Sequence, residues 1–117
     1  MPTVWFGVTV DCLDSPRVAR FSISLLGREA QSSVHGWVYL GRRGDPEPRL
    51  VFQPVRVARL GKNRLHLDGT VDDVDEAVER VIALGGQPTG ERHEYDDGVV
   101  VVMTDPEGHE FCVVRYV

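Results

Sequence analysis

Hydrophobic and polar residues alternate in several short stretches of the chain, which is the pattern of strands that bury one face. In residues 4–12, Phe6, Val8 and Val10 share one face, and the other face carries Trp5, Gly7, Thr9 and Asp11. Similar patterns predict further strands at residues 28–34, 37–40, 49–53, 63–71, 87–95, 99–103 and 109–116. The chain is therefore expected to be rich in strands.

Two stretches instead repeat their hydrophobic residues at helical spacing. The first follows Asp14, a residue type that caps helices, and ends at Gly27. The second runs from Val74 to Leu84, and we expect Asp72 to be its N-cap. One helix thus follows the first strand in each half of the chain.

The two halves of the chain resemble each other. Leu25–Gly27 matches Leu84–Gly86 and Asp14 matches Asp73, in both cases at an offset of 59 residues. The same offset at a helix end and at a cap favours an internal duplication over chance. The expected organisation is a single domain with two repeats of one strand, one helix and three strands, spanning residues 1–117 in all, with the repeats at approximately 4–56 and 63–117.

Composition and charge exclude several classes of function. At 117 residues the chain is one domain of ordinary size, and its net charge of -5 has the wrong sign for neutralising phosphates. It contains no apolar run near the roughly 20 residues that span a bilayer, and no signal-peptide pattern. Cys12 and Cys112 form no CxxC pair. We expect a cytoplasmic protein with two free thiols that binds neither nucleic acid nor membranes.

Two motifs in the second half carry a resemblance to a known family. They are the strand Arg64–Asp68, which reads RLHLD, and the closing segment Asp105–Val114, which reads DPEGHEFCVV. Together with the paired βαβββ pattern, they resemble the vicinal oxygen chelate superfamily of glyoxalases, bleomycin-resistance proteins and extradiol dioxygenases. The resemblance implies an α+β fold in which both modules form a curved, eight-stranded mixed sheet, a half-barrel cup with helices outside and a ligand cavity inside. It also implies a homodimer.

In the metal-using members of this superfamily, the first and last strands of each module supply the ligands. Position by position, the resemblance places the first-strand ligands at Gly7 and His66, and the last-strand ligands at Cys112 and at Phe52 or Gln53. Gly7 has no side chain and Cys112 offers a soft thiol, whereas an oxygen-activating cation takes three or more N or O ligands. We therefore expect no cofactor. A divalent metal on His66, Cys112 and Gln53 is the alternative.

The same faces supply candidates for binding a small molecule. His66 is either a ligand anchor or general base, or a cavity-lining histidine that hydrogen-bonds Asp68. Gly7 is expected to leave a space opposite His66, beside aromatic rings on which a flat ligand can stack. The expected ligand-binding residues are Trp5, Gly7, Thr9, Trp37, Tyr39, Gln53, Arg64, His66 and Cys112. The other histidines, His35, His93 and His109, are expected at the surface.

Three functions agree with this sequence. The first is a small-molecule-binding protein with an aromatic-lined cavity and an incomplete metal site, which sequesters a ligand or confers resistance. The second is a metal-assisted lyase, isomerase or dioxygenase in which His66 is catalytic. The third is an interaction module in which the cavity has lost its role. The missing metal ligand at Gly7 favours the first of these.

Overall fold

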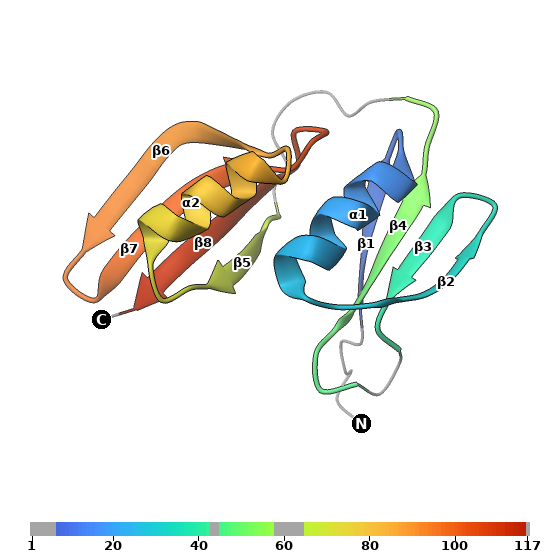
Figure 1. Ribbon diagram of the computed structural model, residues 1–117, viewed down its shortest axis with the longest axis horizontal. Coiled ribbons are helices and arrows are strands. Elements are labelled where there is room, and N and C mark those ends of the chain that lie inside the picture. The colour runs from blue at the N-terminus through green and yellow to red at the C-terminus, as the bar shows by residue number, and fades with distance from the viewer. Residues whose placement is uncertain (1–6, 43–44, 58–64, 117) are drawn as a thin grey trace. The chain divides into compact units, whose positions relative to one another are not determined.

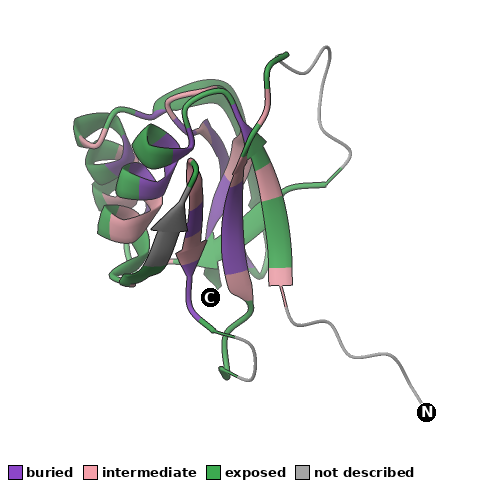
Figure 2. Ribbon diagram, turned by 90° about the vertical axis from the view of Figure 1, so that its right-hand side faces the viewer, coloured by how far each residue is buried: buried purple, intermediate pink, exposed green. Residues whose placement is uncertain are grey.

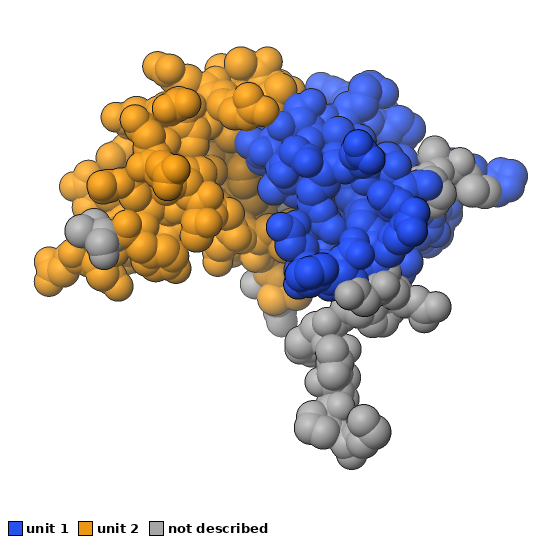
Figure 3. Space-filling view, turned by 60° about the horizontal axis from the view of Figure 1, so that its bottom comes forward, with its two compact units in different colours: residues 1–59 blue, residues 60–117 orange. Residues whose placement is uncertain are grey.

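The computed structural model describes residues 7–42, 45–57 and 65–116. The chain forms two compact units, Met1–Arg59 and Leu60–Val117, which Figure 3 colours separately. We describe each unit by itself. Each contains one helix and four strands in the order βαβββ, which confirms the α+β fold and the two tandem modules.

Unit 1 is a four-stranded mixed sheet with one helix (Figure 1). Its elements are β1 (Gly7–Cys12), α1 (Ser15–Leu26), β2 (Ala30–Val34), β3 (Trp37–Leu40) and β4 (Arg49–Pro54). The strand order is β1-β4-β3-β2, in which β1 and β4 are parallel and the other pairs are antiparallel. The strand that the sequence marks only weakly, at residues 28–34, is β2.

Unit 2 repeats this arrangement. Its elements are β5 (Leu67–Thr70), α2 (Val74–Ala83), β6 (Gln87–Tyr95), β7 (Gly98–Thr104) and β8 (Glu110–Tyr116). The strand order β5-β8-β7-β6 has the parallel pair, β5 and β8, in the same place as β1 and β4. Of the strand expected at 63–71, the described residues form a strand only at Leu67–Thr70, so His66 lies just before the strand begins.

Aspartate caps start both helices. Asp14 accepts a hydrogen bond from the backbone N–H of Arg17, and α1 ends at Gly27, whose φ of 65° is left-handed. In α2 the cap is Asp73, which accepts from the N–H of Glu76, so the expectation that Asp72 caps this helix was wrong by one residue. No helix in the described part of the chain is long and apolar enough to cross a membrane.

The core of unit 1 lies between α1 and one face of the sheet. Alternate residues of β3 and β4, together with Val10 and Cys12 of β1, pack on the helix side, and Figure 2 shows the buried residues at this junction. The cluster consists of Cys12, Val18, Ala19, Val38, Leu40, Leu50 and Phe52. Because neighbouring residues of a strand point to opposite faces, Trp37, Tyr39 and Gln53 lie on the face away from the helix.

Unit 2 buries residues on both faces of its sheet. Met103 and Val81 are fully buried, as expected where α2 crosses the sheet. On the opposite face, Val102, Cys112 and Val114 form a second apolar cluster. This face therefore has an apolar floor although no helix of unit 2 covers it.

A buried carboxylate organises the turn before β8. Asp105 is 8% exposed, and its carboxylate accepts hydrogen bonds from the backbone N–H groups of Glu107 and His109. The Nδ1 of His109 lies 2.6 Å from the second carboxylate oxygen. His109 was expected at the surface. It is instead half-buried, because the turn folds its ring back onto Asp105.

We predict that Asp105→Ala destabilises the protein by about 2–4 kcal/mol, because it leaves two backbone donors and one imidazole without their buried acceptor. Urea unfolding followed by circular dichroism measures the effect. Asp96→Ala, which removes an exposed carboxylate from the turn between β6 and β7, is the control and is expected to change stability by less than about 0.5 kcal/mol. Equal effects of the two substitutions would contradict the structural role of Asp105.

Candidate functional site

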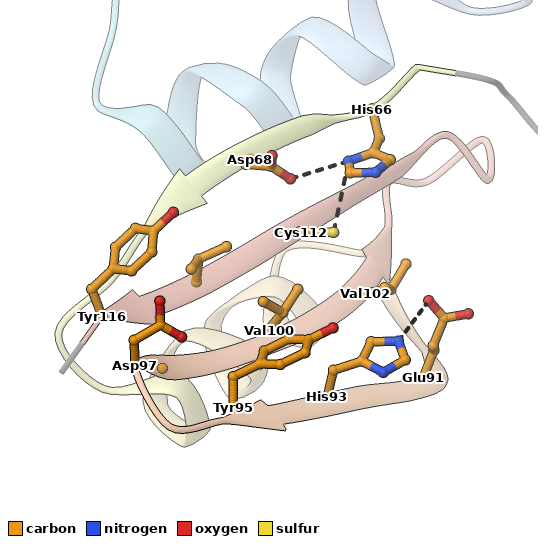
Figure 4. A pocket seen from close by; sticks show the side chains of 12 residues that line it. His66, Asp68, Glu91, His93, Tyr95, Asp97, Val100, Val102, Cys112 and Tyr116 are labelled. Carbon is orange, nitrogen blue, oxygen red and sulfur yellow. Dashed lines mark hydrogen bonds and ion pairs between the residues drawn. The ribbon is translucent and has the colours of Figure 1, made fainter.

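A cavity of about 390 Å³ lies on the helix-free face of unit 2 (Figure 4). The sheet supplies its floor and the ends of β5, β6 and β8 supply its rim. The described lining residues are His66, Asp68, Glu91, His93, Tyr95, Asp97, Gly98, Val100, Val102, Cys112, Val114 and Tyr116. The site thus combines an apolar floor with polar and aromatic walls.

Strand register explains why these side chains meet. Val102 pairs with Cys112 and Val100 pairs with Val114, and paired residues of a sheet share a face. On β6 the pairing of His93 with Val100 gives His93 the same face, and alternation adds Glu91 and Tyr95. The cavity is therefore a direct product of period-two alternation in three strands.

His66, Asp68 and Cys112 lie together at one end of the cavity. The Nδ1 of His66 is 3.1 Å from a carboxylate oxygen of Asp68, and the Sγ of Cys112 is 3.8 Å from the same nitrogen. Since a carboxylate only accepts, the Nδ1–H of His66 donates to it. In the neutral ring, Nε2 is then an acceptor available to a ligand.

The thiol of Cys112 is held in its neutral form. Burial, followed by the nearby charges of Asp68, Glu91 and Glu110, raises the pKa of Cys112 to about 11. The thiolate is the reactive species of cysteine, so this site is unsuited to nucleophilic catalysis at neutral pH. Cys12 and Cys112 are both buried, and neither forms a disulfide.

The residues predicted for ligand binding divide between the units. Trp5 and Arg64 lie outside the described residues. His66 and Cys112 line the cavity of unit 2, whereas Gly7, Thr9 and Gln53 belong to the helix-free face of unit 1. Trp37 and Tyr39 also lie on that face, where their rings stack with centroids 6.4 Å apart and the guanidinium of Arg49 lies over Tyr39.

The expected space beside Gly7 is absent. A Cβ at this position would meet the backbone oxygen of Arg49 at 2.9 Å, which is closer than real side chains approach. Gly7 is therefore explained by the close approach of β1 to β4. The expectation that a larger residue here fills an open part of the cavity was wrong.

The residues do not fit the four-ligand divalent site that the resemblance implies. Asp68 pairs with Cys112, and its counterpart in unit 1, Thr9, pairs with Val51. Val51, rather than Phe52 or Gln53, therefore corresponds to Cys112. Because Gly7 and Val51 carry no donor atom, unit 1 supplies no ligand from the two corresponding positions.

Sequence analysis missed the far wall of the cavity. His93 is exposed, as expected, but it also lines the cavity, and Glu91, Tyr95, Asp97 and Tyr116 were not singled out. The signal was present, because Glu91, His93 and Tyr95 are spaced by two residues and Tyr116 lies four residues after Cys112. The pattern was hidden by the many polar residues of β6, all of which are exposed.

Comparison with known proteins gives a consistent picture. The model of the glyoxalase-like domain family matches residues 7–114. No curated protein matches the chain at a significant level.

Many solved structures share the fold. The fosfomycin resistance protein FosX from Listeria monocytogenes is 18% identical with a TM-score of 0.79, and the match covers 100% of this chain and 96% of that one. A glyoxalase/bleomycin resistance protein/dioxygenase family enzyme from Burkholderia phytofirmans is 17% identical with a TM-score of 0.76, covering 94% and 96%. A lactoylglutathione lyase from Agrobacterium tumefaciens is 19% identical with a TM-score of 0.70, covering 98% and 95%.

We predict that alkylation of Cys112 by iodoacetamide has a pH profile whose midpoint lies near pH 11, as the raised pKa requires. Asp68→Asn is expected to move this midpoint to lower pH, because it removes a negative charge and a hydrogen-bond partner that favour the neutral thiol. Peptide mass spectrometry separates Cys112 from Cys12. Glu79→Gln, on the exposed side of α2, is the control that leaves the midpoint unchanged, and a wild-type midpoint near pH 8.5, the value of an ordinary thiol, contradicts the prediction.

Proposed function

The chain belongs to the glyoxalase-like domain family, within the vicinal oxygen chelate superfamily, and we propose that it binds a small organic molecule in the cavity of unit 2 without the help of a metal. The observation that carries this proposal is the cavity itself, which joins a valine floor to convergent polar groups. Sites for small molecules combine these two features.

His66 has the clearest role in this proposal. Its Nδ1–H is engaged by Asp68, which fixes the tautomer and orients the ring. The remaining ring nitrogen can accept a hydrogen bond from the ligand. Cys112 stays neutral beneath it and forms part of the buried floor.

The names of two structural neighbours suggest biological roles that involve a small molecule. One neighbour is named for fosfomycin resistance and another for lactoylglutathione lyase activity. At 18% and 19% identity these likenesses show the fold alone, but a protein that sequesters a ligand needs only the cavity. We propose sequestration or resistance as the role, carried out in the cytoplasm by the homodimer that the sequence resemblance implies.

We predict that a thermal-shift screen of metabolites and antibiotics, with fosfomycin and S-lactoylglutathione included, finds at least one compound that raises the melting temperature. A ligand that binds only the native state must stabilise it. His66→Ala is expected to abolish the shift for that compound. His35→Asn is the matched control, because it removes an exposed imidazole from the turn of unit 1 and asparagine tolerates its φ of 52°. Absence of any stabilising compound, or equal shifts in His66→Ala, would refute the proposal.

A metal-assisted lyase, isomerase or dioxygenase is the second candidate. It is favoured by one observation, that a nitrogen of His66, an oxygen of Asp68 and the sulfur of Cys112 lie within 4.8 Å of one another. Imidazole, carboxylate and thiolate are all ligands that zinc accepts. A metal-assisted reaction would therefore depend on these three residues as ligands, because unit 1 supplies none from its two corresponding positions.

We predict that protein purified without chelator carries no stoichiometric Zn, Ni, Mn or Fe by elemental analysis, because the family ligand set is incomplete. We also expect no metal-dependent turnover of the hemithioacetal of methylglyoxal. Stoichiometric metal that is lost in His66→Ala, together with turnover that a chelator abolishes, would favour the second candidate over the first.

A further inference from the structure

We propose that the ligand of this cavity is an organic cation, a molecule with a protonated or quaternary amine attached to an apolar body. This inference rests on the proposed function and names the chemical class of its ligand. It is drawn from the acceptors, the charges and the aromatic rings that line the cavity.

Acceptors predominate in the polar lining, although Tyr95, Tyr116 and Cys112 each carry one donor. Asp68, Glu91 and Asp97 are carboxylates, which accept only. His66 and His93 each lie within hydrogen-bond distance of a carboxylate, at 3.1 Å and 3.3 Å, so each donates one ring N–H to a carboxylate of the protein. The second ring nitrogen of each is an acceptor when the imidazole is neutral. A ligand that satisfies this lining must bring donors, and an ammonium group brings up to three.

The cationic side chains of the same strands lie on the other face. Arg92 of β6 alternates away from the cavity and pairs with Asp75 of α2 and with Glu94. Arg115 of β8 donates to the backbone oxygen of Asp72. Among the described residues, neither arginine nor lysine lines the cavity, so its three carboxylates are not neutralised by a permanent cation.

The carboxylates of the lining act together on any group that enters the cavity. Asp68, Glu91 and Asp97 repel an anion there and, by the same Coulombic interaction, favour a positive charge on a ligand.

Two tyrosines define the place for the cationic group. Tyr95, Gly98 and Tyr116 are direct partners on β6, β7 and β8, so they form a row across the sheet on the cavity face. Strands lie about 4.8 Å apart, which puts the two tyrosine positions roughly 10 Å apart with a residue without a side chain between them. Gly98 is required there because a Cβ would meet the backbone oxygen of Arg115 at 2.4 Å.

A carboxylate completes this end of the cavity. Figure 4 shows Asp97 between the side chains of Tyr95 and Tyr116. Both rings are largely exposed, at 60% and 69%, and Tyr95 is supported on one side by the ring of His93, with centroids 6.1 Å apart. Aromatic rings and a carboxylate close to one another are elements that recognise ammonium groups.

The rest of the cavity suits an apolar body. Val100, Val102 and Val114 form the floor between the tyrosine row and His66. A ligand whose cationic group lies at the tyrosine row would place its apolar part on these valines. A donor group at its other end would reach the acceptor nitrogen of His66.

A matched series of probes tests this assignment. Phenethylamine, phenethyl alcohol and phenylacetate share one aromatic body and differ in carrying a positive, a neutral and a negative end. We expect NMR titration of the full chain at pH 7.5 and low salt to show binding in the order amine, alcohol, carboxylate, with shifts confined to β6, β7 and β8. Benzyltrimethylammonium is expected to bind as well, because its cation needs no hydrogen bond to interact with the rings.

Variants separate the charge from the rings. Asp97→Asn is expected to weaken the binding of phenethylamine roughly fivefold, which is in the range of an exposed ion pair. The binding of phenethyl alcohol is expected to stay unchanged. Tyr116→Leu is expected to weaken the binding of benzyltrimethylammonium roughly threefold, which is in the range of an exposed cation–π contact. Glu79→Gln removes the same charge from α2 and is expected to change neither.

The outcomes distinguish this inference from the proposed function. Equal or tighter binding of the alcohol or the carboxylate overturns the organic cation, as does failure of all the probes while a compound from the thermal-shift screen binds. Loss of amine binding in Glu79→Gln also overturns it, because the effect would then reflect net charge alone. The proposed function is decided separately, by the screen and by His66→Ala.

Discussion

The alternation of side chains along a strand is the constraint on which both units depend. A helix covers one face of each sheet, so the residues directly beneath it are apolar, as Val38, Leu40 and Phe52 are under α1. The residues between them are then directed to the opposite face and are released from that requirement. In unit 2 this face carries the chemistry, and a shift of one residue in any strand would exchange floor and core.

The same constraint explains how far the sequence was informative. Both helices and all eight strands of the described chain follow from periodicity and capping, whereas the choice between Phe52 and Gln53 as the cavity-facing residue stayed open until the structure placed Phe52 in the core under the helix. Periodicity does not fix which residues of two neighbouring strands pair, and the assignment of Phe52 or Gln53 as the counterpart of Cys112 depended on that pairing. The register places Val51 there.

Residues of the site were predicted only where a residue type that can bind a ligand or a metal stands in a clearly alternating strand. His66 and Cys112 meet both conditions, and they lie 3.8 Å apart although they are 46 positions apart in the sequence. Glu91, His93 and Asp97 lie in a polar stretch in which a face cannot be recognised without its partner strand. Gly7 shows a second limit, because the absence of a side chain does not reveal whether space or backbone lies beside it.

Replacement of oxygen ligands changes what the cavity can select. Where a metal is held, its positive charge compensates the carboxylates and attracts the oxygen atoms of a substrate. Here Gly7 and Val51 supply no donor, while Asp68, Glu91 and Asp97 remain in the cavity with only histidines beside two of them. Negative charge that no resident cation balances must be solvated by water or matched by the ligand, and an apolar floor favours the latter. The organic cation proposed for this cavity would supply the positive charge that a bound metal supplies where the ligand set is complete.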